Sequence, residues 1–155
     1  MKLLIALCVI AFLVTVGVAQ SAEKIDEFGA IPCDDYLARA DMIATQLQSN
    51  PASRVFLLLY QGRERIYSPR KKRDVMVLPT VDQTLSRVRS IKGRYRSYKI
   101  DISRLVFVDG GARETGSVEV WLVPTGAEPP KATPTLASIR HRRGKGNGFC
   151  FEDGL

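Results

Sequence analysis

Side chains that could act as an acid, a base or a nucleophile are few in this sequence and do not cluster. His141 is the only histidine, and it has no evident nucleophile partner. Asp34 and Asp35 are adjacent, and adjacent helix residues do not face each other, so the start of a helix explains them better than a catalytic carboxylate pair. Asp109 precedes two glycines, which favours a turn over a catalytic strand end.

The sequence also contains no metal-ligand cluster, no phosphate-binding glycine loop and no nucleophile elbow. We therefore expect no enzymatic activity, no metal site and no cofactor. A small hydrolase with an unrecognised site is the alternative.

Basic side chains, by contrast, are abundant and unevenly distributed. The chain carries 23 Lys and Arg residues against 16 Asp and Glu residues. Residues 63–104 hold 13 of these bases, whereas residues 20–62 hold three bases and six acids. Tyrosines such as Tyr67 stand among the arginines, an arrangement that suits stacking on sugars. The pattern indicates an anion-binding face, and the alternative is an ordinary solvated surface.

The first residues, MKLLIALCVIAFLVTVGVAQ, have the layout of a secretory signal peptide over residues 1–19. Lys2 gives a positive start, an apolar run follows, and Gly17 and Ala19 stand at positions minus three and minus one of a cleavage site. The apolar run is shorter than the roughly 20 residues that a membrane anchor needs. We expect an exported protein, periplasmic or secreted, that is not an integral membrane protein.

Export also narrows the possible partners. Removal of residues 1–19 would leave 22 basic and 16 acidic residues, a formal net charge of +6. DNA is an improbable partner outside the cytoplasm, so no nucleic acid is expected. An anionic polymer of the cell envelope, an acidic protein or lipid head groups fit better.

Two cysteines remain after the signal peptide, Cys33 and Cys150. An even number of cysteines in an exported chain predicts a disulfide, which would tie the C-terminal tail to the start of the domain. The alternative is a pair of unrelated buried thiols.

The hydrophobic pattern predicts alternating strands and helices. We expect strands over 25–31, 54–60, 105–108 and 117–123, with helices over about 33–49 and from residue 80 onward. Residues 61–79 are expected to form an exposed loop, and the last two strands a hairpin. Four prolines make residues 124–135 a semi-rigid linker before a basic tail.

The second helix carries the most distinct start signal. Thr80 and Gln83 form a potential capping box, in which the Thr80 hydroxyl accepts from the Gln83 amide. Six apolar residues follow at helical spacing and predict one buried stripe: Val81, Leu85, Val88, Ile91, Tyr95 and Tyr98. The order strand–helix–strand–helix–strand–strand predicts an α/β (α+β) fold, a two-layer sandwich with a small mixed sheet whose parallel strands are joined by right-handed crossovers.

This order resembles the C-terminal, peptidoglycan-binding domain of the outer-membrane protein A family over roughly residues 25–124, within a domain that we predict over residues 20–124. The resemblance rests on the segments DMIATQLQSNP, the apolar strand over 54–60, LSRVR and KIDISRLVFVDGG. Leu85 and Ser86 match the family's helix start, and Ile100 and Arg104 match its later turn and basic residue. The resemblance implies a ligand-binding arginine at Arg87, or at Arg89 after a shift of two residues. The chain also resembles small exported bacterial proteins of unknown role.

In that family an aspartate after the second strand binds the ammonium group of diaminopimelate. Here the chain reads Gln61, Gly62, Arg63, Glu64, so only Glu64 could substitute. Arg63 and Arg65 flank it, and two like charges about 4 Å apart cost roughly 4 kcal/mol at an effective dielectric constant of 20. The ammonium-binding mode is therefore not expected.

From the charge pattern and the resemblance together, we expect a non-catalytic binding or structural module that contacts an anionic envelope component. A protein–protein interaction domain without a polymer ligand and a small envelope hydrolase are the alternatives. The candidate binding residues are Arg63, Glu64, Arg65, Arg87 and Arg89.

Overall fold

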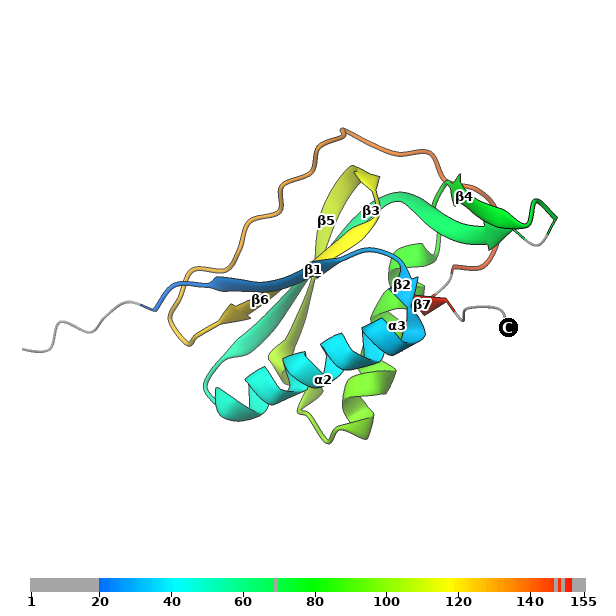
Figure 1. Cartoon of the computed structure of the whole chain (residues 1–155). Coiled ribbons are helices and arrows are strands. Elements are labelled where there is room, and N and C mark those ends of the chain that lie inside the picture. The colour runs from blue at the N-terminus through cyan, green and yellow to red at the C-terminus, as the bar shows by residue number, and fades with distance from the viewer. Residues whose placement is uncertain (1–19, 69, 147, 149, 152–155) are drawn as a thin grey trace, which may run out of the picture.

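A computed structural model describes residues 20–68, 70–146, 148 and 150–151, and its two helices and five-stranded, mostly antiparallel open sheet make an α+β fold (Figure 1). The predicted fold class is thereby confirmed. The predicted signal peptide, residues 1–19, lies outside the described residues. None of the described helices is long and apolar enough to cross a membrane.

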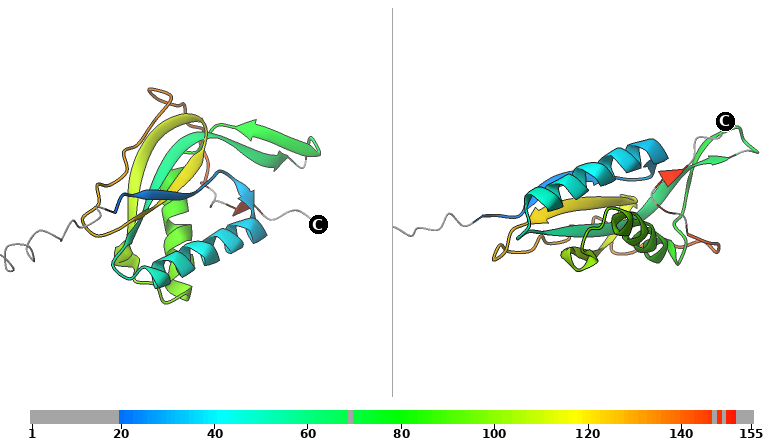
Figure 2. Two further views of the ribbon diagram at one scale, coloured as in Figure 1. Left: turned by 60° about the vertical axis from the view of Figure 1, so that its left-hand side comes forward. Right: turned by 90° about the horizontal axis from the view of Figure 1, so that it is seen from below.

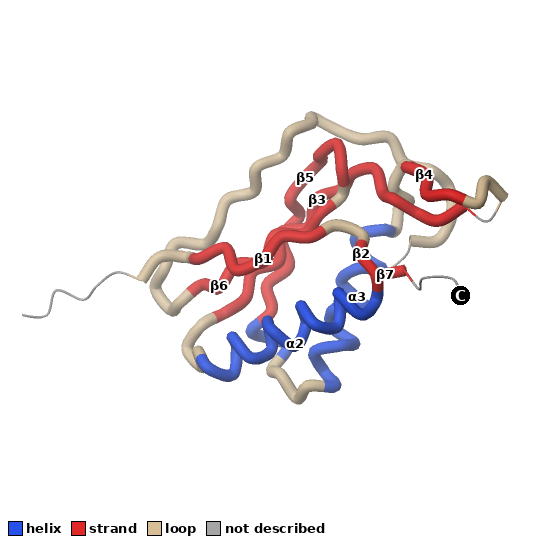
Figure 3. The backbone as a smooth tube through the Cα atoms, in the orientation of Figure 1, coloured by secondary structure: helices blue, strands red, loops and turns tan. Residues whose placement is uncertain are grey.

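The elements follow one another along the chain as the tube in Figure 3 shows. Their bounds are β1 (Glu23–Phe28), β2 (Ile31–Pro32), α2 (Cys33–Ser49), β3 (Arg54–Ser68), β4 (Arg73–Val77), α3 (Gln83–Ser97), a 3-10 turn (Ile102–Arg104), β5 (Leu105–Thr115), β6 (Ser117–Val123) and β7 (Cys150–Phe151).

The main sheet has the strand order β1-β6-β3-β5, and β4 pairs with the end of β3. β6 is antiparallel to both β1 and β3, whereas β5 is parallel to β3, its partner across α3. The sheet is therefore mixed, as predicted. Within the described main sheet only β3 and β5 form an adjacent parallel pair, because β6 inserts between β1 and β3, the two strands that α2 connects.

The predicted hairpin of the last two strands is wrong, because β3 lies between β5 and β6. One residue, Gly116, links these two strands, and the link crosses directly over β3. A Cβ atom on Gly62 would lie 2.1 Å from the backbone nitrogen of Gly116. The same Gly116 nitrogen donates to the carbonyl of Arg63 at 3.0 Å. The crossing thus requires glycine at position 62.

Both helices cover one face of the sheet and pack on the inward residues of the central strands (Figure 2). Helix α2 buries Tyr36, Ala40, Ile43, Ala44 and Leu47, which recur at helical spacing. Arg104 caps the C-terminal end of this helix. Its guanidinium donates to the carbonyls of Leu47 at 2.9 Å and Asn50 at 2.7 Å, where a cation suits the negative end of the dipole.

The opposite face of the sheet is covered by the chain after β6, which runs along it as an extended strap, residues 124–146 (Figure 1). Leu136 forms an isolated bridge with Ala112 of β5, and Arg142 donates its amide to the carbonyl of Pro79 at 2.9 Å. Leu58 and Tyr60 are buried on this face, so β3 is covered on both sides, as its continuous apolar run predicts.

Residues 61–79 do not form the predicted loop. β3 continues to Ser68 and turns back as β4, and this β3–β4 hairpin extends beyond the rest of the sheet (Figure 2). Alternate residues of β3 face the same side of this hairpin. Glu64 and Ile66 share one face, where they lie opposite Val77 and Val75 of β4. The basic residues between the strands hid this pattern in the sequence.

The predicted capping box at the second helix is also wrong. Helix α3 begins at Gln83 and not at Thr80, and Asp82 takes the N-cap position. Thr80 instead forms a parallel bridge with Arg142 of the strap. Its hydroxyl lies 2.9 Å from the Asp82 carboxylate. The long-range pairing of Thr80 therefore replaces the local cap.

The predicted turn at Asp109 lies inside β5. The register with β3 shifts at this point, and Gly111 adopts a φ of +79°, so the glycines form a β-bulge. The Asp109 carboxylate accepts from the Gly111 amide at 2.9 Å.

The predicted disulfide between Cys33 and Cys150 is present, with the two Cα atoms 4.6 Å apart. Beside it, β2 and β7 form a short parallel pair. The end of the strap is thus fixed to the start of α2. A disulfide is consistent with an oxidising, extracytoplasmic compartment.

Candidate binding site

The β3–β4 hairpin determines which way the three consecutive candidate residues on β3 point. Successive strand residues face opposite sides, so Glu64 points inward while Arg63 and Arg65 point outward. Arg65 lies directly opposite Met76 of β4, and Tyr67 lies opposite Asp74. The outward face of this hairpin is therefore basic, and it also exposes two large side chains, those of Tyr67 and Met76.

Glu64 and Arg87 form a buried ion pair at the base of this hairpin. The Arg87 Nη2 atom lies 2.5 Å from the Glu64 Oε1 atom. Arg87 is 2% exposed and Glu64 is 6% exposed. Burial raises the pKa of Glu64, and the positive charges of Arg87 and Arg142 offset this only in part. Burial likewise lowers the pKa of Arg87, against the attraction of Glu64.

The burial of Arg87 follows from how α3 is rotated. The residues that α3 buries are Gln83, Arg87, Ile91 and Tyr95, at steps of four. Of the predicted apolar stripe, Val81 is 80% exposed and Leu85 is 58% exposed. The prediction of one apolar stripe is therefore wrong at the start of the helix, where Gln83 and Arg87 are buried in place of Val81 and Leu85. The C-terminal half of the stripe packs in the core as predicted.

The candidate residues do not all meet at one place. Arg87 faces Glu64 inside the protein, whereas Arg89 is exposed on another side of α3. Arg89 lines a shallow depression beside the Cys33–Cys150 disulfide. Arg63, Glu64 and Arg65 border a hollow of about 310 Å³ that also contacts Gly116. The structure thus groups the hairpin residues and separates Arg89 from them.

A larger cleft of about 480 Å³ adjoins the same hairpin on the side of the strap. Arg63 from β3 lies at its edge, together with Glu114 from β5 and Arg140 from the strap. The structure shows no ion pair or side-chain hydrogen bond of these three residues within the described part of the chain. Their charges are available to a ligand.

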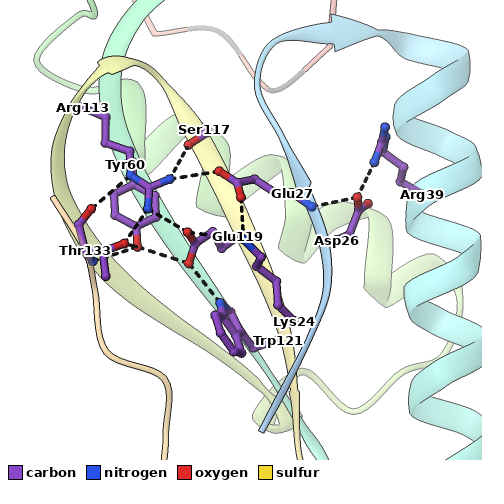
Figure 4. Close-up of polar contacts among 10 residues, drawn as sticks. All are labelled: Lys24, Asp26, Glu27, Arg39, Tyr60, Arg113, Ser117, Glu119, Trp121 and Thr133. Atoms are coloured by element: carbon purple, nitrogen blue, oxygen red, sulfur yellow. Dashed lines mark hydrogen bonds and ion pairs between the residues drawn. The ribbon is translucent and has the colours of Figure 1, made fainter. Parts of the chain in front are cut away.

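A second polar cluster, centred on Arg113 and Glu119, lies between the sheet and the strap (Figure 4). The Arg113 guanidinium lies 3.3 Å from the centroid of the Tyr60 ring and donates to Glu119 at 2.7 Å. It also donates to the Thr133 hydroxyl at 2.8 Å, while the Thr133 amide donates to the Tyr60 hydroxyl at 3.1 Å. These contacts fasten the strap to the sheet.

Glu119 is a buried, charged side chain on the face of β6 that the strap covers, opposite to the face on which Val118 and Val120 pack against the helices. Desolvation raises its pKa, but hydrogen bonds from Arg113 and Trp121 outweigh this and hold the pKa below its usual value. Sequence reasoning missed this cluster. The available signal was Glu119 itself, because a carboxylate on a strand covered on both sides needs a cationic partner.

The sites rejected from the sequence have structural explanations. The His141 ring lies 2.5 Å from the Gln61 side chain. Asp34 and Asp35 occupy the first turn of α2, as expected for residues near the positive end of a helix. Over the described residues, no group of three or more His, Cys, Asp or Glu side chains is placed to hold a metal ion.

Comparison of the chain with protein-family models, with curated proteins and with solved structures finds no match.

Proposed function

We propose that this protein is an exported, non-catalytic binding module that contacts an anionic component of the cell envelope through the outward face of the β3–β4 hairpin. The observation that carries the proposal is the placement of Arg63 and Arg65 beside the exposed side chains of Tyr67 and Met76. Neither arginine has a carboxylate partner among the described residues. Both can therefore exchange water for an anion.

Arg87 has a different role in this proposal. Its guanidinium is bound to Glu64 and buried, so it fixes α3 against the hairpin and does not meet the ligand. The same pair supports the expectation that no ammonium group binds at Glu64. We propose that the order of strands and helices relates this chain to the outer-membrane protein A family. We also propose that its mode of ligand binding differs from that of the family.

The test is sedimentation of the purified protein with insoluble cell-wall polymer at low and high salt. We expect binding that weakens with salt, because exposed charges are screened over roughly 10 Å at 0.1 M ionic strength. The double variant Arg63→Glu/Arg65→Glu should lose binding. The control Arg96→Glu/Lys131→Glu makes the same change in net charge at exposed positions outside the hairpin and should retain it.

Binding that is indifferent to salt, or lost equally in both double variants, would refute the proposal. Detectable turnover of the polymer would refute its non-catalytic part.

A protein partner bound by strand addition, with no polymer ligand, is the second candidate, and the edge of β4 favours it. In the described chain β4 pairs with β3 alone, so its other edge can accept an added strand. This candidate predicts co-purification of one defined protein that survives Arg63→Glu/Arg65→Glu. The substitution Val75→Pro, which blocks strand pairing, should abolish it.

A further inference from the structure

The cleft of about 480 Å³ between the hairpin and the strap has a chemical character that goes beyond a basic surface. Its volume falls within the range of roughly 300–1,000 Å³ that is usual for small-molecule sites. Its walls come from three parts of the chain that are distant in sequence: β3 and β4, the end of β5, and the strap.

The strap wall of the cleft is held in place at both of its ends. At one end, the amide of Leu136 donates to the carbonyl of Ala112 at 3.0 Å. At the other, the amide and the Nε atom of Arg142 donate to the carbonyls of Pro79 and Leu78, each at 2.9 Å. The segment between residues 136 and 142 is therefore anchored on both sides.

Apolar side chains line the cleft from both walls. Met76 and Leu78 come from the hairpin side, and Leu136 and Ile139 come from the strap. Met76 is 50% exposed, so a ligand in the cleft can reach it. A ligand that covered these four residues would gain from apolar burial.

The charges at the cleft define the polar end of such a ligand. Arg63 and Arg140 contribute two positive charges and Glu114 one negative charge, which leaves a net charge of +1. Two guanidinium groups can hold the oxygens of one carboxylate or phosphate by charge-assisted hydrogen bonds. Glu114 disfavours a head group of higher negative charge.

We infer that this cleft binds a single-chain anionic amphiphile, an alkyl chain that carries one singly charged head group. The head contacts Arg63 and Arg140, and the chain covers the apolar side chains between the hairpin and the strap. This goes beyond the proposed function, because it assigns a small-molecule site of defined chemistry that needs the strap as well as the hairpin.

The experiment is a titration of the ¹⁵N-labelled protein, with its disulfide intact, followed by NMR. Three probes separate the two parts of the ligand: octanoate carries both, octan-1-ol carries the chain without the charge, and acetate carries the charge without the chain. Vesicles of an anionic phospholipid form a fourth arm. We expect saturable binding of octanoate, with shifts centred on residues 76–78 and 136–140, and at least tenfold weaker binding of octanol and acetate.

Arg140→Ala should weaken octanoate binding roughly tenfold, the loss of one charge-assisted hydrogen-bonding partner. Arg143→Ala, an exposed arginine three residues further along the strap, is the matched control and should bind as the parent does. Met76→Glu adds a like charge on the apolar floor and should abolish binding. Unchanged circular dichroism of each variant shows that the fold is intact.

Octanol binding as strong as octanoate binding would overturn the inference, as would equal affinities of the Arg140→Ala and Arg143→Ala proteins. Binding to vesicles without binding to octanoate would also overturn it. Failure of octanoate binding, with salt-dependent sedimentation on cell-wall polymer retained, would remove this site and leave the proposed function standing. Octanoate binding without any sedimentation on cell-wall polymer would remove the proposed function and leave this site standing.

Discussion

Replacement of Arg87 by methionine tests whether Glu64 and Arg87 are a buried pair that the fold needs. Methionine retains much of the length of the side chain but removes the charge, so Glu64 keeps its buried position without its closest cation. Breaking a buried pair in this way typically costs about 3–5 kcal/mol of unfolding free energy. That is a large fraction of the roughly 5–15 kcal/mol available to a domain.

Protonation of Glu64 sets an upper limit on this loss and gives it a pH dependence. To protonate a carboxyl group with an ordinary pKa of about 4.3 at pH 7 costs about 3.7 kcal/mol, so the loss at pH 7 should be no more than about 3.7 kcal/mol. Without Arg87 the pKa of Glu64 is raised further above its unfolded value, because burial already raises it. A native state that binds more protons than the unfolded state loses stability as pH rises. The deficit should therefore shrink by up to about 3 kcal/mol between pH 7 and pH 4.5, because the raised pKa of Glu64 in the parent makes the parent gain some stability as well.

The assay is urea unfolding at both pH values, with the disulfide oxidised and the parent protein measured beside each variant. Arg89→Met is the matched control, because Arg89 lies two residues further along the same helix and is exposed. It should change the unfolding free energy by less than about 0.5 kcal/mol. The double variant Glu64→Leu/Arg87→Met removes both charges and should recover most of the loss. Equal effects of Arg87→Met and Arg89→Met at pH 7, or a deficit that does not shrink in acid, would refute the reasoning.

The remaining predictions concern the strand crossing, the disulfide and the cluster beneath the strap. Gly62→Ala should destabilise the protein by more than about 3 kcal/mol or prevent folding, because its Cβ would lie 2.1 Å from a backbone atom. Gly93→Ala, at a helical position with nothing within 4 Å, should instead stabilise by about 0.5–1 kcal/mol, and urea unfolding of both variants checks the contrast. Reduction of the Cys33–Cys150 disulfide, which spans a sequence separation of 117, should lower the unfolding free energy by about 4–5 kcal/mol, and an unchanged thermal midpoint after reduction would contradict this. Because the pKa of Glu119 is lowered in the fold, its contribution is present above its unfolded pKa and is lost as pH falls through the folded pKa. The cost of Glu119→Gln should therefore be largest at neutral pH and vanish in strong acid, as a series of unfolding curves from pH 7 to pH 2 would show.

Local sequence patterns predicted the parts of the fold that depend on local physics. Helix α2 ends at Ser49, before Pro51, and β6 has the predicted bounds Ser117–Val123. The local sequence could not predict that β5 and β6 each pair with β3 and not with each other. This pairing depends on the close passage of Gly116 over Gly62, which neither segment shows on its own.

The candidate site was predictable as residues but not as an arrangement. The sequence picks out Arg63, Glu64, Arg65, Arg87 and Arg89. It does not show that Arg87 turns inward, because α3 offers two possible stripes, one through Leu85 and one through Arg87. The second stripe is buried, since Glu64 supplies a partner that comes from a distant strand. The strap wall of the cleft was equally hidden, because prolines mark an extended segment without indicating what it lies against.

The single-residue link at Gly116 decides where this protein can be labelled. Short connections between strands at a surface usually accept inserted residues, but this one passes over another strand and has no slack. An epitope or fluorophore placed there would disturb the pairing of β5 and β6 with β3. The turn at Gly126 is the better place, because a Cβ atom added there would meet nothing within 4 Å.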